Sequence, residues 1–241
     1  MSSHVSDPTE TAESARFERA IVRFDAAHAA DPDHETVDGR EQPKELVFAR
    51  RMSAMLARYA PEAPEIVRLA ARCQHIERWQ IPRGEYAMDR IGCLQWRKRL
   101  NKFRAKFAGN ILREVGDDEA TIGRVAMLVR KEALKTDAEA QMLEDLVDLV
   151  FLESHLAGFV ATQDRYDIAK FRDILAKMAK KMSACGRAAA LTRETRAART
   201  RAADRGRDGG SGRRLSGCYS PSVGVVGIPD AVVPRRFSLP R

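Results

Sequence analysis

"TDAEAQMLEDLVDLVFLESHL", residues 136–156, indicates the fold class more clearly than any other part of the chain. Apolar residues cover most of the circumference of a helix drawn through it, as is typical of a helix that packs on several sides. Thr136 and, three residues later, Glu139 predict a capping box at its start. On a helical wheel the remaining polar residues fall within about 60° of one direction; they are Gln141, Glu144, Asp145, Asp148 and His155. We therefore expect a largely buried helix with one narrow polar stripe.

The sequence on either side of this stretch is also helical in character. Aromatic residues make up only 6% of the chain, while 44% of the residues are apolar, which favours helices around a real core over an aromatic-rich sheet. Start and stop signals place further helices at about residues 14–30, 43–59, 64–79, 93–115, from 117 onward and at 164–182, with a loop at 31–42. We predict an all-α fold, a single compact bundle of six to seven helices over residues 14–184.

The two ends of the chain have a different composition. Residues 186–241 contain twelve arginines, no lysine and four acidic residues, so they carry the whole net charge of +8 and the preceding body is neutral. The basic charge therefore gives no argument that the folded body binds nucleic acid. We predict that residues 1–13 and 185–241 are disordered. The Arg-rich tail is either the product of a shifted reading frame in a GC-rich gene or an arm that binds nucleic acid.

The cysteines and the hydropathy pattern indicate a cytoplasmic protein. Cys73, Cys93, Cys185 and Cys218 show neither the spacing of a zinc site nor that of a disulfide framework. The N-terminus has no signal-peptide pattern, and no apolar run reaches the length of a membrane span. We expect no membrane partner.

Two predicted helices carry residues suited to catalysis or metal binding. His75 is the one histidine on the predicted central helix 64–79, and a neutral imidazole offers a lone pair to a metal or a proton. The carboxylates of the polar stripe, Glu144, Asp145 and Asp148, form an acidic stripe. This acidic stripe either faces water or lines a cleft, and a cleft with several carboxylates would attract a divalent metal. His75 is either a ligand of that metal, together with Asp145, or a core-edge imidazole with a local hydrogen bond.

A basic stretch, residues 90–106, contains seven cationic residues and no acid. They are Arg90, Arg97, Lys98, Arg99, Lys102, Arg104 and Lys106. Trp79, Tyr86 and Trp96 lie among or close to them, and Lys131 and Lys135 extend the patch. The stretch is a solvated face, a partner for the acidic stripe, or a site where cations and rings hold a phosphate-bearing ligand.

Three segments resemble the domain-of-unknown-function family 4202. They read "VDGREQPKELVFARRM", "AARCQHIERWQIPRGEYAMDRIGCLQWRKRL" and "AEAQMLEDLVDLVFLE", and the similarity covers about residues 14–184. Members of that family are small helical proteins, some labelled glutamyl-tRNA synthetase. This chain lacks the glycine-rich phosphate loop and the alternation of strands and helices that a nucleotide-binding α/β domain needs, so we do not expect a synthetase.

The order of the helices is also similar to that of the HD phosphohydrolase superfamily, in which His and Asp side chains hold a metal above a phosphoester. That resemblance implies a catalytic site of Glu45, His75 and Asp145, with His75 and Asp145 on the metal. The chain departs from the superfamily because Ile76, not an aspartate, follows His75. It departs from family 4202 at Arg104, where members tend to have a histidine, and a guanidinium has no lone pair for a metal.

Together these patterns predict a phosphate-bearing small molecule or nucleotide as ligand, bound between helices and hydrolysed if a divalent metal is held there. The phosphate would be held by Arg78, Arg83, Arg90, Arg97 and Lys131. Whether the chain is an enzyme stays open at this point. The alternative is a non-enzymatic module that binds RNA or an acidic protein through residues 90–106.

Overall fold

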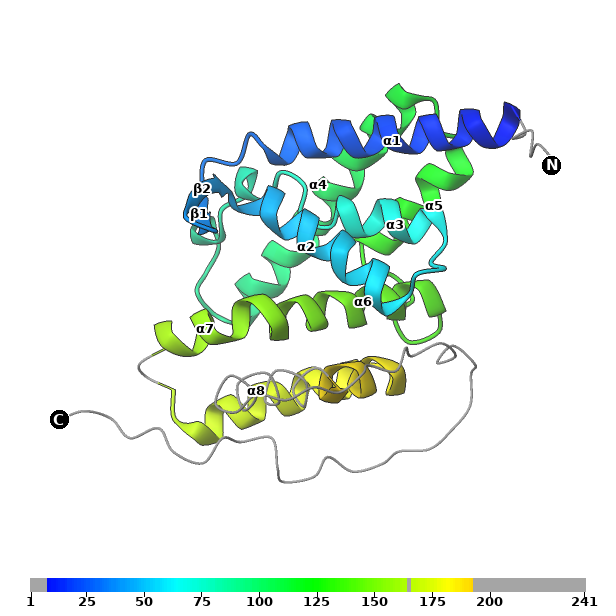
Figure 1. The fold of residues 1–241 in the computed structure, drawn as a ribbon. Helices are drawn as coiled ribbons and strands as arrows, with labels where there is room; N and C mark the ends of the chain where they lie inside the picture. Colours follow the sequence, from blue (N-terminus) through cyan, green and yellow to red (C-terminus); the bar gives the residue numbers. More distant parts are fainter. Residues whose placement is uncertain (1–7, 164–165, 193–241) are drawn as a thin grey trace. The chain divides into compact units, whose positions relative to one another are not determined.

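The computed structural model describes residues 8–163 and 166–192 (Figure 1). The chain divides into two units, Met1–Glu194 and Thr195–Arg241, and the second lies outside the described residues. The helices of the first unit are α1 (Pro8–His28), α2 (Lys44–Tyr59), α3 (Glu65–Arg72), α4 (Arg90–Val115), α5 (Glu119–Val129), α6 (Ala138–Val150), α7 (Leu156–Thr162) and α8 (Ile168–Lys181). A π-helical turn, Phe151–His155, joins α6 to α7. The prediction of an all-α fold is confirmed.

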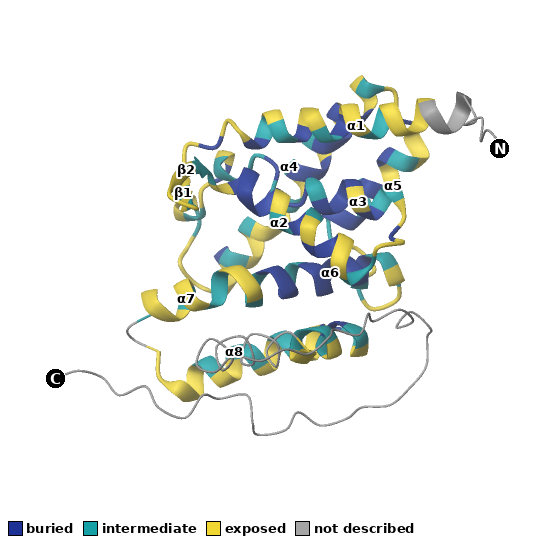
Figure 2. Ribbon diagram, viewed as in Figure 1, coloured by how far each residue is buried: buried dark blue, intermediate teal, exposed yellow. Residues whose placement is uncertain are grey.

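Helix α3 lies at the centre of the bundle. It contacts α1, α2, α5 and α6, and its residues Val67, Leu69, Ala70 and Ala71 are fully buried (Figure 2). Helix α4 packs on α1 and α5, and α8 packs on α6. The buried side of α6 joins the same core through Leu146, which is 0% exposed. The core thus holds α2, α3 and α6 together, and these helices position the site.

Several boundaries differ from those predicted. Helix α1 begins at Pro8, inside the segment predicted to be disordered. Helix α3 ends at Arg72, and the chain continues through turns in which Glu77 adopts a left-handed conformation (φ 50°). Residues 184–192 are helical, although 185–192 fall in the predicted tail; of that tail, 193–241 lie outside the described residues.

The start of α6 is capped by a residue other than the predicted one. The side chain of Asp137 accepts a hydrogen bond from the backbone N–H of Ala140 (2.9 Å), so Asp137 is the N-cap. Thr136 instead donates its hydroxyl to the carbonyl of Ala133, and Glu139 pairs with Arg124. The predicted capping box is wrong because the carboxylate next in the chain takes its place.

The loop predicted at residues 31–42 contains a β-hairpin. Strands β1 (His34–Val37) and β2 (Arg40–Pro43) pair antiparallel. The turn residues Asp38 and Gly39 both have positive φ (51° and 75°), as a two-residue hairpin turn requires. The hairpin leads into α2, where Asp31 accepts a hydrogen bond from the backbone N–H of Glu45 (2.9 Å). Glu45 is thereby fixed in the first turn of α2.

The segment between α3 and α4 is held by specific polar contacts. The indole Nε1–H of Trp96 donates to the carbonyl of Ile81 (2.8 Å), and Asp89 caps α4 through the N–H of Gly92. A side chain at position 92 would place its Cβ 2.2 Å from the carbonyl oxygen of Ala87, so only glycine fits there. These contacts hold residues 73–89 against α4.

Candidate functional site

The imidazole of His75 is held by two side chains of α2. Its ring stacks on the ring of Phe48, with centroids 3.9 Å apart and planes 8° from parallel. Its Nδ1 lies 3.0 Å from Oε2 of Glu45. The His75 side chain is 20% exposed, and its Nε2 makes no hydrogen bond with a described residue. One edge of the ring is therefore fixed, and the other is available to a ligand.

The surroundings of His75 keep it neutral. Burial lowers the pKa of His75 well below its usual value, and the charges of Arg104, Arg78 and Lys131 lower it further. Burial raises the pKa of Glu45, and the charge of Arg78 opposes that rise. Because Nδ1 faces a carboxylate, we assign its proton there, which leaves the lone pair on Nε2. Nε2 can accept a hydrogen bond at neutral pH.

Arg78 joins the pair of Glu45 and His75 from the turn that follows α3. Its guanidinium lies 3.7 Å from Oε1 of Glu45 and 5.5 Å from the ring centroid of Trp96. Trp96 belongs to the first turns of α4, so the ring that carries Arg78 also closes the 73–89 segment. Stacking on an aromatic ring restricts the guanidinium while leaving donors free.

Arg104 is the buried charge of the cluster. It is 5% exposed and donates hydrogen bonds to the backbone carbonyl of Gln74 and to Oδ1 of Asn101. No carboxylate lies within ion-pair distance of it among the described residues. Burial lowers the pKa of Arg104 to about 10, helped by the charge of Arg78, so it remains a cation at neutral pH. We call Glu45, His75, Arg78, Arg104 and Lys131 the His75 cluster.

The acidic stripe of α6 is buried and does not face water (Figure 2). Glu144 and Asp148 are each 6% exposed. Glu144 pairs with Lys131 (2.6 Å) and Lys181 (3.7 Å), and none of its ion pairs involves the basic stretch 90–106. Burial, followed by the charge of Glu144, raises the pKa of Asp148 to about 7. The stripe is covered by α8 and by lysines, so it does not pair with the basic stretch.

Asp145 lies in a separate, fully bonded site. Its carboxylate accepts hydrogen bonds from the Tyr59 hydroxyl (2.9 Å), the Gln141 amide (3.1 Å) and the backbone N–H and hydroxyl of Ser183. Glu45 and Tyr59 are fourteen residues apart on α2, a rise of about 21 Å. Asp145 is thus bound at one end of α2 and His75 at the other, and the structure does not bring them together.

The remaining predicted phosphate ligands differ in what they contact. Arg83 donates to the carbonyls of Tyr86 (2.9 Å) and Ala87 (2.7 Å), so its guanidinium organises the loop before α4. Arg90 and Arg97 are exposed on α4. Of the predicted set, Glu45, His75, Arg78 and Lys131 form one neighbourhood. Asp145, Arg83, Arg90 and Arg97 do not make hydrogen bonds or ion pairs with it among the described residues.

Two residues of this neighbourhood had no assigned role in the sequence analysis. Phe48 supports the ring of His75 and also lies 6.0 Å from that of His155, whose pKa is lowered by burial. Phe48 reads as an ordinary apolar position of α2, and only the fold shows that it separates two imidazoles. Asp31, next to a proline, follows the end of α1 at His28, and it also accepts a hydrogen bond from the first turn of α2, fourteen residues away.

The family model described as "Domain of unknown function (DUF4202)" matches residues 18–202. The chain belongs to this family. The match extends beyond residue 184, where we predicted the folded region to end. No curated protein and no solved structure matches the chain, and the likeness to HD phosphohydrolases stays a prediction.

Two further findings concern metals and membranes. Within residues 8–163 and 166–192, no group of three or more His, Cys, Asp and Glu side chains is arranged to hold a metal ion. None of the helices in that part of the chain has the length and apolar character needed to cross a membrane.

Proposed function

We propose that this chain binds a phosphate-bearing small molecule or nucleotide at the His75 cluster. The observation that carries the proposal is the buried guanidinium of Arg104, which has hydrogen bonds to neutral oxygens and no paired carboxylate. Taking a charge out of water costs several kcal/mol unless an opposite charge lies close to it. A bound anion would supply that charge.

The other members of the cluster are suited to the same ligand. Arg78 is 39% exposed, and one of its nitrogens faces Glu45 while the others do not. It can therefore donate hydrogen bonds to an anion that enters from solvent. Lys131 adopts a left-handed conformation (φ 59°) and places its ammonium on Glu144 while its charge still acts on His75. Because Glu144 offsets the charge of Lys131, the cluster sets the two guanidiniums of Arg78 and Arg104 against the single carboxylate of Glu45. The excess of positive charge favours a phosphate group.

His75 gives the site one neutral hydrogen-bond acceptor. Glu45 orients the ring through Nδ1, and the neutral Nε2 can accept a hydrogen bond from a ligand hydroxyl, from water or from a protonated phosphate oxygen. The cluster therefore sets an acceptor beside its phosphate-binding cations. This arrangement supports the binding of a ligand that carries both a phosphate and a hydroxyl group.

The donor set of the cluster does not fit a divalent metal. Only Glu45 and His75 offer metal-binding atoms there, and the surrounding guanidinium and ammonium groups repel a cation. Arg104, in the place of a family histidine, adds a fixed charge and no lone pair. We derive no hydrolytic step through a metal, and Asp145 takes no part in the proposed site.

The proposal is tested by calorimetric titration of the full chain with inorganic phosphate, pyrophosphate and a nucleoside triphosphate. One charge-assisted contact contributes about 1.5–3 kcal/mol, so Arg104→Gln should weaken binding by about tenfold or more. Arg104→Lys keeps the positive charge but loses the forked donors of the guanidinium, so its affinity should lie between those of the wild-type chain and Arg104→Gln. Arg50→Gln is the matched control, because Arg50 is an exposed arginine on α2 that donates a hydrogen bond to Gln42 (3.4 Å), which is outside the His75 cluster.

A second variant distinguishes a loss of phosphate binding from a loss of folding. Arg78→Gln changes a half-exposed side chain and should leave the denaturation midpoint nearly unchanged while weakening phosphate binding. If every phosphate ligand binds Arg78→Gln and Arg104→Gln as tightly as the wild-type chain, the His75 cluster is not the site. Stoichiometric bound metal in the purified protein would also overturn the assignment of this cluster to a metal-free anion site.

A further inference from the structure

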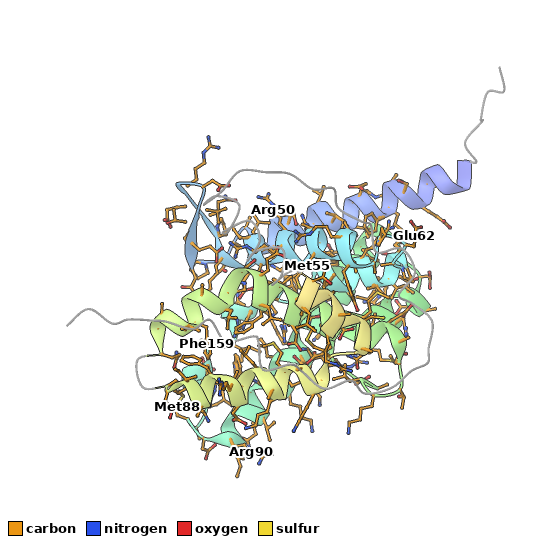
Figure 3. The ribbon with its side chains drawn as sticks, turned by 60° about the horizontal axis from the view of Figure 1, so that its bottom comes forward. Arg50, Met55, Glu62, Met88, Arg90 and Phe159 are labelled. Atoms are coloured by element: carbon orange, nitrogen blue, oxygen red, sulfur yellow. The ribbon has the colours of Figure 1, made fainter. Side chains whose placement is uncertain are left out.

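The outward side of α4 carries exposed apolar residues and unpaired lysines in one row. Ile91, Leu94, Lys98, Lys102 and Lys106 are spaced three or four residues apart and so project on one side of the helix. Met88 immediately precedes the helix, close to Arg90 (Figure 3). We call these six residues, Met88 included, the α4 outer face. It contains no residue of the His75 cluster, and the inference from it does not depend on that cluster.

The first half of this face is an apolar patch. Met88 is 83% exposed, Ile91 67% and Leu94 56%. Single exposed apolar side chains are ordinary on protein surfaces, but three large ones within seven residues at the start of a helix are typical of an interaction site. Removing apolar surface from water contributes about 25 cal/mol per Å². This patch offers a partner a place for apolar anchors.

The second half of the face is a lysine row that lacks counter-charges. Like charges four residues apart on a helix destabilise it by about 0.2–0.5 kcal/mol per pair. Lys98, Lys102 and Lys106 make no ion pair within the described part of the chain. Lys177, on the exposed side of α8, pairs with Asp173 at this same spacing (2.7 Å). A carboxylate at this spacing thus balances an exposed lysine on α8, whereas the lysine row has none, and an anionic partner could supply the missing counter-charge.

A groove runs beside the lysine row, between α4 and α5. It has a volume of about 450 Å³, and its floor includes Ala105, Gly109 and Ala126. Lys102 and Lys106 form one wall. A Cβ at position 109 would lie 3.3 Å from the side chain of Ile122, so the small residue allows the two helices to approach closely. Arg113 and Arg130 also line the groove, each paired with a nearby glutamate, Glu119 and Glu132.

We propose that the α4 outer face docks an acidic segment of a partner protein. Apolar anchors of that segment would cover Met88, Ile91 and Leu94, and its carboxylates would meet the lysine row. The apolar patch gives nothing to a phosphate backbone, and none of the groove-lining residues has an aromatic ring on which a base would stack. A flat bilayer would not fill the groove, whereas side chains of a bound segment would. The shape and charge together favour a protein partner.

The test uses the full chain and fluorescence anisotropy with labelled synthetic helical peptides of about 20 residues, with leucines in one half and glutamates in the other. Two peptides carry these halves in opposite order. Lys98→Gln combined with Lys102→Gln should weaken the binding of the better peptide by about tenfold, and Leu94→Ser should do the same. Added salt should weaken wild-type binding and have little effect on the double lysine variant. Lys177→Gln is the matched control for loss of an exposed lysine.

Three other probes define the results that would overturn the proposal. They are a uridine-rich RNA, vesicles that contain phosphatidylserine, and the chain itself in a sedimentation experiment over a range of concentrations. RNA or vesicle binding that exceeds peptide binding and is lost in the lysine variant would assign the face to that partner. Self-association that Leu94→Ser abolishes would assign it to a second copy. The absence of binding by both peptides, or binding indifferent to Leu94→Ser, would also refute the proposal.

Discussion

Replacing Asp145 by alanine should release the C-terminal helical segment from the bundle. The carboxylate accepts hydrogen bonds from Tyr59, Gln141 and Ser183, and it is 1% exposed. Ser183 in turn accepts a hydrogen bond from the N–H of Gly186, so Asp145 holds the residue that caps the helix at 184–192. The substitution removes the acceptor on which this whole junction depends.

The size of the effect follows from the donors left behind. The Gln141 amide can keep its bond to the carbonyl of Lys181, but the Tyr59 hydroxyl and both the N–H and the hydroxyl of Ser183 lose their acceptor. An unsatisfied buried donor costs about 1–3 kcal/mol. Three such donors give a loss of about 3–9 kcal/mol in the free energy of unfolding, a large part of the 5–15 kcal/mol typical of a domain. Asp145→Asn should cost about 1 kcal/mol, because its oxygen and amide can bond to the same hydroxyls.

Urea denaturation and limited trypsin digestion measure this effect in two independent ways. Asp145→Ala should lower the denaturation midpoint and speed cleavage after Arg187, which lies in the released segment. Asp173→Ala, which removes an exposed carboxylate of α8 paired with Lys177, is the control and should change either measurement little. If Asp145→Ala loses less than about 1 kcal/mol and is cleaved at the wild-type rate, the carboxylate does not hold this junction.

The other two predictions concern the same face of α6. Burial and the charge of Glu144 raise the pKa of Asp148 to about 7. The folded chain therefore binds this proton more tightly than the unfolded chain does. The free energy of unfolding of the wild type should fall as the pH rises from about 4 to 7. Asp148→Asn should remove a slope worth a few kcal/mol in urea titrations over that range; equal slopes would contradict the assignment. Gly186→Ala places a Cβ 2.6 Å from the Asp145 carboxylate carbon, so it should lower the thermal midpoint, whereas an exposed helical glycine would gain stability from alanine.

The helices were predictable wherever local chemistry decides them. Gly116 ends α4 with a positive φ of 92°, which glycine tolerates, and α5 is capped one residue after its predicted start at 117, by Asp118 through the N–H groups of Ala120 and Thr121. The hairpin also had a local signal, the Asp38–Gly39 pair, which is typical of a two-residue hairpin turn. The prediction of a loop at residues 31–42 did not take this pair into account. In each case the determining residues lie within four positions of the boundary, so sequence alone contains them.

The end of α3 was not predictable because a distant residue decides it. The apolar pattern continues to Trp79, which is why the sequence predicted a helix over 64–79. In the structure the guanidinium of Arg104 takes the carbonyl of Gln74, and the chain leaves the α-helical path after Arg72. This contact spans thirty residues. The change of path also brings His75 to Glu45, so the candidate site depends on a tertiary contact that no periodicity shows.

Asp145 was placed in one site with His75 by the resemblance to HD phosphohydrolases and by the direction of the polar stripe, and the stripe gives no position along the helix. A helical wheel gives the direction of a side chain around the axis and discards its position along the axis, so residues 144 and 155 appear together although eleven residues separate them by about 16 Å. The hydrogen-bond and ion-pair partners of the polar groups distinguish the two ends of α2 better than the direction of those groups on a helical wheel does. The Asp145 carboxylate has protein donors on both oxygens and no capacity for a ligand. The buried guanidinium of Arg104 feels the charge of Glu45 but makes no ion pair with a described carboxylate, and an incompletely paired buried group of this kind is what a binding site requires.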